Sequence, residues 1–139
     1  MCIRDRHLVA PMEADLTDFG VEGLKTEEAV VEALENQEGT LLLVVNSVCG
    51  CAAANARPAV KFALQNEKKP AKSATVFAGV DQAATSKARE YLLPYPPSSP
   101  SIALFKDGQL VHFIERHHIE GRSAEMIAAN LKMAFDAYC

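Results

Sequence analysis

Four short patterns of apolar and β-branched residues along the chain each predict a β-strand. Residues 40–46 (TLLLVVN) are largely apolar, which is typical of a strand covered on both faces. Residues 74–79 (ATVFAG) predict a second strand. Residues 101–105 and 109–114 predict two more, and the Asp107-Gly108 dipeptide between them is a strong hairpin signal.

Apolar residues at helical spacing predict five helices. The expected spans are 7–19, 27–38, 52–65, 83–92 and a last helix after residue 123. Thr26 and Ser123 are suitable N-caps for the second and the last of these helices. Pro58 falls inside the third helix and removes one backbone hydrogen bond there, so we expect a kink about one turn after residue 51.

The order of these elements predicts the fold class. A strand–helix–strand unit over residues 40–79 requires a right-handed crossover and gives parallel strands, whereas the hairpin gives antiparallel ones. We therefore expect an α/β fold with a mixed four-stranded sheet flanked by helices on both faces. Residues 7–139 are expected to form this single domain, and residues 1–6 are a polar segment that fits no element.

Composition excludes several classes of partner. The 139 residues are 49% hydrophobic, enough for the core of one domain. The 14 basic and 18 acidic residues give a net charge of -4, and no Lys/Arg cluster marks a nucleic-acid surface. No apolar run is long enough for a membrane span or a secretory signal. We expect a cytoplasmic protein with neither nucleic acid nor membrane as a partner.

The Cys49-Gly50-Cys51 tripeptide is the main chemical feature, since it stands between the predicted strand 40–46 and the helix that follows. Unpaired N–H groups and the dipole at a helix N-terminus favour the reactive thiolate. A disulfide across one residue closes a small, strained ring that is easily reduced, and Gly50 supplies the dihedral freedom. We expect Cys49 to be the nucleophile and Cys51 the resolving thiol.

Two other interpretations of the cysteines remain open. Both thiols could be buried and act as small apolar side chains. Cys49, Cys51 and Cys139 could instead bind zinc with a histidine from among His112, His117 and His118. No second cysteine knuckle supports that set, so no metal is expected. Four cysteines are also too few and too oddly spaced for a secreted disulfide scaffold.

Pro100 directly precedes the predicted strand 101–105. In a fold of this order, a cis X–Pro bond would sit there, opposite the cysteines. Such a turn leaves backbone groups of Ser99 and Ser101 available to a bound substrate chain. The alternative is an ordinary trans proline in the proline-rich segment 94–100.

Other polar residues carry weaker expectations. His112 lies in an apolar strand and is expected to pack there. Arg116, His117 and His118 are expected in a solvated loop, where they could help to bind an acidic low-molecular-weight thiol. Asn46 and Ser47 could hydrogen-bond a thiolate or close the turn. Cys2 is given no role, and nothing in the pattern places Cys139 near Cys49.

Several motifs resemble the bacilliredoxin family, thioredoxin-fold proteins of bacteria that make bacillithiol. They are VVNSVCGCAA at 44–53, ARPA at 56–59, VFAG at 76–79, PSSPS at 97–101, VHFI at 111–114, IEG at 119–121 and AFDAYC at 134–139. The resemblance covers the chain from about residue 8 onward. It implies a thioredoxin-like fold.

The resemblance also implies an activity, the removal of bacillithiol from S-bacillithiolated client proteins. Cys49 would take the bacillithiol, and Cys51 or a second bacillithiol would resolve the adduct, with bacillithiol as co-substrate and no bound cofactor. The chain has no Cys-x-x-Cys motif and no tryptophan, which argues against a general thioredoxin-like reductase. A general protein disulfide isomerase or reductase and a non-catalytic metal-binding module remain the alternatives.

Overall fold

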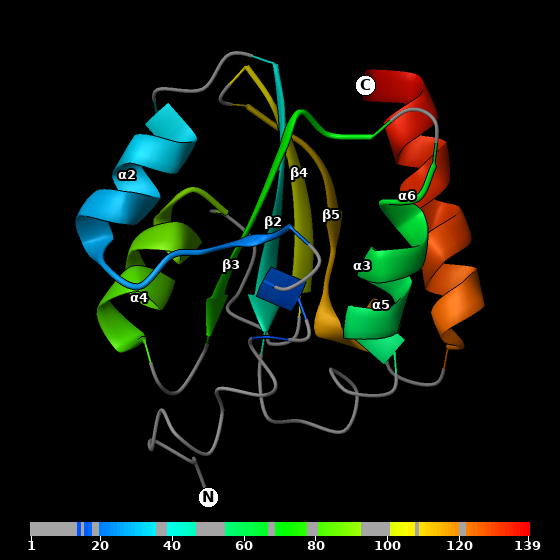
Figure 1. Cartoon of the computed structure of the whole chain (residues 1–139), viewed down its shortest axis with the longest axis horizontal. Coiled ribbons are helices and arrows are strands. Elements are labelled where there is room, and N and C mark those ends of the chain that lie inside the picture. Colours follow the sequence, from blue (N-terminus) through cyan, green and yellow to red (C-terminus); the bar gives the residue numbers. More distant parts are fainter. Residues whose placement is uncertain are drawn as a thin grey trace, which may run out of the picture.

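The computed structural model describes residues 14, 16–17, 20–35, 39–46, 55–66, 69–77, 81–92, 101–107, 109–119 and 122–139, without the side chains of residues 116 and 117. These residues form a twisted sheet between two layers of helices (Figure 1). The strands are β1 (Glu22–Gly23), β2 (Thr40–Asn46), β3 (Lys72–Phe77), β4 (Ser101–Lys106) and β5 (Gln109–Ile114). The helices are α2 (Glu27–Glu35), α3 (Arg57–Ala63), α4 (Gln82–Glu90), α5 (Arg116–Ile119) and α6 (Ala124–Tyr138).

The sheet has five strands in the order β1-β3-β2-β4-β5, so the expectation of four strands was one short. The additional strand, β1, has two residues and pairs in parallel with β3 through Glu22–Ala74 and Gly23–Thr75. Two residues are too few to show an alternating pattern. β1 forms because its backbone can pair with the edge of β3, so tertiary contact and not a local sequence preference determines this strand.

The strand directions agree with the sequence. β2 and β3 are parallel, whereas β2 and β4, and β4 and β5, are antiparallel. Asp107, at the predicted hairpin, has a positive φ of 51°. Its carboxylate accepts a hydrogen bond from the Gly39 N–H (2.8 Å), and its own N–H donates to the Gly39 carbonyl (2.7 Å). The hairpin is thereby fixed to the turn that leads into β2.

All seven residues of β2 are buried, as predicted for a strand covered on both faces. Leu42 and Val44 belong to the apolar cluster under α3 and α6. Leu41, Leu43 and Val45 belong to the cluster under α2 and α4. The sheet thus separates two cores (Figure 1).

The helices predicted over 52–65, over 7–19 and after residue 123 are each described at least in part. α3 is α-helical over 57–63, Asn55 and Ala56 form a π-helical turn before it, and Pro58 lies in its first turn. The irregular turn lies where the kink was expected, while residues 52–54 lie outside the described residues. Of the helix predicted over 7–19, only Ala14, Leu16 and Thr17 are described, and all three are helical. In α6, the predicted cap is confirmed, since the Ser123 hydroxyl accepts the Met126 N–H (3.2 Å).

Strand β5 contains a β-bulge that changes which side chains face α6. Leu104 is opposite His112, but its neighbour Phe105 is opposite Leu110, so Val111 is the extra residue. Val111 packs on the α3/α6 core, and the ring of His112 reaches Asn130 on α6. Two consecutive side chains therefore face the same helix. Within the described ranges, no helix has the length and apolarity needed to cross a membrane.

Candidate functional site

Most residues of the predicted site, namely Cys49, Gly50, Cys51, Ser99 and Pro100, lie outside the described residues, as does Ser47. Ser101 is the one predicted binding residue that the structure describes. It is the first residue of β4 and is 1% exposed. The structure does describe the ends of β2 and β4, to which the segments with Cys49–Cys51 and Ser99–Pro100 are joined in the chain.

The register of β2 and β4 places the origins of both segments at one end of the sheet. Val45 pairs with Ser101, and the fully buried Asn46 ends β2. The chain therefore leaves β2 toward Cys49 at the end where it enters β4 from Pro100. Cys49 is three residues beyond Asn46, and three residues of extended chain span at most about 11 Å.

Asn55 holds the chain that follows the cysteines. Its side-chain amide donates hydrogen bonds to the carbonyl of Ile119 (3.1 Å) and to the carbonyl of Arg122. Asn55 is four residues after Cys51, whereas Ile119 is the last residue of α5 and Arg122 lies between α5 and α6. This role of Asn55 was not predicted from the sequence. The available signal was a single polar amide in a run of alanines.

Arg57 was also missed. It lies in the first turn of α3 and is only 5% exposed, so a charged side chain is buried there. Buried arginines require partners, because removing a guanidinium from water is costly. Its positive charge is located at the same end of α3 as the helix dipole's positive pole, and both favour an anion at that end.

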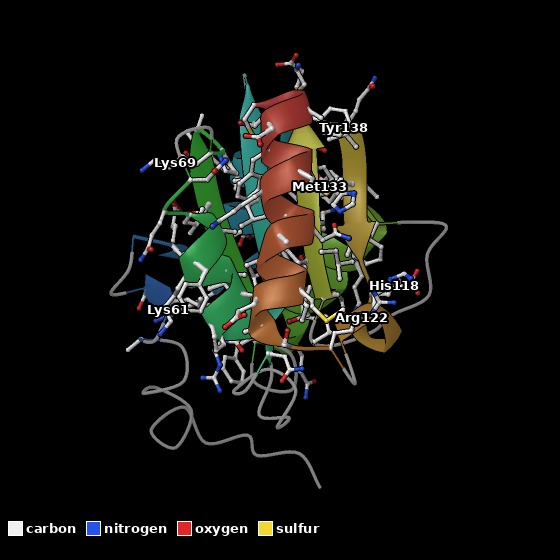
Figure 2. All side chains as sticks on the ribbon, turned by 90° about the vertical axis from the view of Figure 1, so that its right-hand side faces the viewer. Lys61, Lys69, His118, Arg122, Met133 and Tyr138 are labelled. Atoms are coloured by element: carbon white, nitrogen blue, oxygen red, sulfur yellow. The ribbon has the colours of Figure 1, made fainter. Side chains whose placement is uncertain are left out.

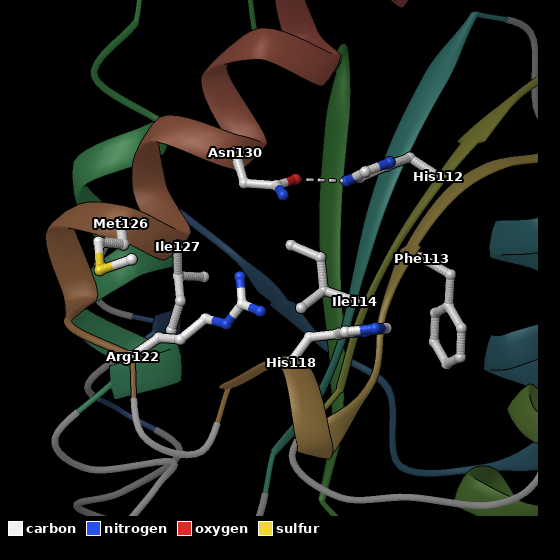
Figure 3. Close-up of a pocket in the computed structure, with 8 residues that line it drawn as sticks. All are labelled: His112, Phe113, Ile114, His118, Arg122, Met126, Ile127 and Asn130. Carbon is white, nitrogen blue, oxygen red and sulfur yellow. Dashed lines mark hydrogen bonds between the residues drawn. The ribbon is translucent and has the colours of Figure 1, made fainter.

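A pocket of about 220 Å³ opens beside the connection between α5 and α6 (Figure 3). β5 contributes His112 and Ile114, and α6 contributes Ile127 and Asn130. His118 of α5 and Arg122 complete the polar part, and the Arg122 side chain extends into the pocket. Among the described residues, none that lines the pocket is acidic. The expected solvated loop at 116–118 is instead the short helix α5, which forms one wall.

Hydrogen bonds orient the polar groups of the pocket. The Oδ1 atom of Asn130 lies 2.7 Å from Nε2 of His112, which donates to it. Nδ1 of His118 accepts the N–H of Glu115 (3.2 Å). His112 is thus a partner for α6, consistent with the packing role expected of it.

The histidines and Cys139 are not assembled into a metal site in the described part of the chain. No group of three or more His, Cys, Asp or Glu side chains there is placed to hold a metal ion. Cys139 is exposed at the C-terminal end of α6, and α5 lies at the other end of that helix (Figure 1). Whether Cys49 and Cys51 bind a metal lies outside the described residues.

Sequence comparisons give close relatives over nearly the whole chain. The family model described as "Disulphide isomerase" matches residues 5–139. The chain is 64% identical to the "Bacilliredoxin" of Cytophaga hutchinsonii over 129 residues, 93% of this chain and 95% of that protein. It is 53% identical to the "Bacilliredoxin" of Bacillus cereus over 135 residues, 96% and 94% of the two chains.

Solved structures with the same fold include thioredoxins. Fasciola hepatica thioredoxin matches with a TM-score of 0.59 at 17% identity, covering 86% of this chain and all of that one. Mitochondrial thioredoxin 3 of Saccharomyces cerevisiae, in its oxidised form, matches with a TM-score of 0.59 at 16% identity, covering 88% and 98%. These matches confirm the thioredoxin-like α/β fold expected from the sequence.

Proposed function

The chain belongs to the bacilliredoxin family, and on that premise we propose that it is a thiol–disulfide oxidoreductase that removes bacillithiol from S-bacillithiolated protein cysteines. The family and the thioredoxin fold support the general class, an oxidoreductase acting on thiols and disulfides. One observation carries the finer proposal. The Cys49-Gly50-Cys51 motif stands in the sequence between β2 and α3 of this fold, in a chain 64% identical to the protein of Cytophaga hutchinsonii named "Bacilliredoxin".

The proposed reaction is two successive exchanges. The Cys49 thiolate attacks the bacillithiol sulfur of the mixed disulfide, the old S–S bond breaks, and the client leaves as a thiolate that takes up a proton. The Cys51 thiolate then attacks the sulfur of Cys49 and releases bacillithiol. The cysteine pair loses two electrons and the mixed disulfide gains them. A second bacillithiol can replace Cys51 in the second exchange, giving bacillithiol disulfide and a reduced Cys49.

The described frame supports these roles. A thiolate at the N-terminal end of α3 would be stabilised by the positive pole of the helix dipole and by the buried Arg57. Asn55 restrains the chain four residues after Cys51, which helps to keep the two sulfurs in a fixed relation to α3. We also propose a cytoplasmic setting, because a reducing compartment keeps such a pair available as thiols.

A general protein disulfide isomerase is the second candidate, favoured by the description of the matching family model. The two functions differ in what becomes attached to Cys49. In the first, Cys49 binds a small thiol. In the second, it binds the client protein itself.

The test is intact-mass spectrometry of Cys51→Ser after incubation with a bacillithiolated client, with Cys49→Ser as the matched control. We expect a bacillithiol-sized adduct on Cys51→Ser, release of the client as a free thiol, and no adduct on Cys49→Ser. A covalent complex with the client would support the isomerase instead. Full activity of Cys49→Ser would contradict the assignment of the nucleophile.

A further inference from the structure

We propose that the pocket between β5, α5 and α6 binds the carboxylate of the acidic low-molecular-weight thiol whose sulfur reacts at Cys49. This inference rests on the proposed function and names the part of the protein that recognises the small thiol. We call the cavity the basic pocket and define it by His112, Ile114, His118, Arg122 and Asn130.

The charge of the basic pocket is opposite to that of the chain. The protein carries a net charge of -4, yet the described lining of the pocket contains Arg122 and two histidines and no acidic side chain. In the described part of the chain, no carboxylate pairs with the Arg122 guanidinium. An arginine with its fork of N–H donors is the side chain best suited to grip a carboxylate. These features favour an anionic ligand.

Other groups that line the basic pocket would strengthen the contact between Arg122 and a carboxylate. Oδ1 of Asn130 is taken by His112, which turns the Nδ2 donor of the same amide toward the pocket (Figure 3). Ile114 and Ile127 are 4% and 2% exposed and form an apolar base. Apolar walls lower the local dielectric constant, so an ion pair there is stronger than one in open water. The volume of about 220 Å³ suits part of a small molecule.

The pocket lies near the end of β2 from which the chain continues to Cys49. Ile114 pairs with Ile102, and Ile102 pairs with Val44, so the three residues lie across adjacent strands. Adjacent strands are about 4.8 Å apart, which places Ile114 about 10 Å from Val44, five residues before Cys49.

A direct connection also exists. Asn55, four residues after Cys51, donates to the carbonyl of Arg122 itself. The residue that would hold the carboxylate is therefore hydrogen-bonded to the segment that follows the cysteines. A thiol with a sulfur at one end and a carboxylate at the other would contact both parts of the molecule at once.

The experiment measures how fast Cys51→Ser is converted to a mixed disulfide by two small disulfides. One is bacillithiol disulfide, which is acidic, and the other is hydroxyethyl disulfide, which is neutral. In each case the Cys49 thiolate forms one S–S bond, one S–S bond breaks, and one small thiol is released. Intact-mass spectrometry follows the product with time.

Two pocket variants are compared in this background. Arg122→Gln removes the charge, and Asn130→Asp keeps an oxygen for His112 but places a carboxylate in the pocket. Lys132→Gln is the control, since it removes one positive charge from α6 outside the pocket. We expect both pocket variants to react about tenfold more slowly with bacillithiol disulfide, because each loses one charge-assisted hydrogen bond. Their rates with hydroxyethyl disulfide should be unchanged. Lys132→Gln should leave both rates unchanged.

The outcomes separate this inference from the proposed function. If Cys51→Ser reacts with neither disulfide, the proposed function fails and this inference fails with it. If it reacts well but Arg122→Gln slows both disulfides equally, the proposed function stands and the basic pocket is only structural. The carboxylate could also come from the client, so the variants are tested on a client carrying a neutral mercaptoethanol adduct. A slower reaction of the variants there would assign the pocket to the client and overturn the inference.

Discussion

The two helical layers of this protein are held to the sheet by different means. Under α2 and α4 the contacts are mainly between small or aliphatic side chains such as Val30, Leu34 and Ala88. A hydrogen bond at the rim links the two helices, from the Tyr91 hydroxyl to the Glu35 carboxylate (2.7 Å). That layer is stabilised by burial, which has little directional preference.

The α3 and α6 layer adds directional polar links to a comparable apolar core. Asn55 donates to the carbonyls of Ile119 in α5 and of Arg122 after it, and Asn66, after α3, donates to Asp136 near the end of α6 (3.0 Å). His112 joins β5 to Asn130. α3 is thus tied to neighbouring elements near both of its ends (Figure 2 views this layer). Burial therefore supplies stability on both sides of the sheet, whereas hydrogen bonds fix positions on the side of α3, the helix that follows the cysteine motif in the chain.

The largest expected effects come from matched truncations in the two cores. Leu42 and Leu43 are adjacent in β2, fully buried, and face opposite layers. Leu42→Ala and Leu43→Ala should each lower the free energy of unfolding by about 2–5 kcal/mol, because each removes buried methyl groups and leaves a cavity. Urea unfolding monitored by circular dichroism measures both. A loss confined to one variant would contradict the claim that burial contributes similarly on both sides.

The polar links should separate stability from activity. Asn55→Ala leaves two carbonyls without their donor, so we expect a loss of about 1–3 kcal/mol in the free energy of unfolding. It should also slow bacillithiol transfer, since the chain after Cys51 loses its restraint. Asn66→Ala removes an exposed bond at the other end of the helix and should cost about 1 kcal/mol or less without changing the rate.

Rate measurements with a bacillithiolated client, at a temperature where all variants are folded, complete this test. Equal transfer rates for the two asparagine variants would mean that the link at Asn55 does not position the cysteine segment.

Much of the fold could be predicted because its signals are local. The strand at 40–46 coincides with β2, the one at 109–114 with β5, and the cap at Ser123 with the start of α6. β1 could not be predicted, since two residues show no periodicity. A role for His118 in binding an acidic thiol was predicted from the sequence, but the place of His112 in the basic pocket could not be, because the bulge at Val111 breaks the alternation that sequence reasoning assumes. The cysteine pair was evident from the sequence, but the link from Asn55 spans 64 residues or more and depends on the folded chain.

Helix caps give a smaller, matched effect in the two layers. The Thr26 hydroxyl accepts the Ala29 N–H (3.1 Å) at the start of α2, and the Ser123 hydroxyl accepts the Met126 N–H (3.2 Å) at the start of α6. Thr26→Ala and Ser123→Ala should each cost about 1 kcal/mol, since each leaves one N–H unpaired. Thermal unfolding measures this. We expect only Ser123→Ala, beside Arg122, to alter the preference for acidic over neutral disulfides, and an equal change in Thr26→Ala would contradict this.

The smallest effect is a pH dependence in the α2/α4 layer. Partial burial and the hydrogen bond to Glu35 raise the pKa of Tyr91 to about 12, from 10.0. A raised pKa means that the folded state favours the protonated phenol, so this contribution is complete below pH 10 and is lost as the pH rises from about 10 to about 12. Ultraviolet titration should show one of the three tyrosines ionising near pH 12.

Tyr91→Phe should remove that late transition, and Tyr138→Phe should leave it in place. Bacillithiol transfer near neutral pH should be unchanged in Tyr91→Phe, because this residue lies after α4, on the opposite side of the sheet from α3. Persistence of the transition in Tyr91→Phe would show that another group causes it.

The irregular β5 also affects whether copies of the molecule can associate edge to edge through their sheets. A long, regular strand at the margin of a sheet offers a row of backbone donors and acceptors to any passing chain, and sheets grow into aggregates by that route. Here one margin is the two-residue β1, and the other is interrupted by the extra residue Val111. Neither margin offers an extended template. An incoming strand would find few consecutive backbone groups to pair with at either margin of the described sheet, which disfavours growth of the sheet between copies of the chain.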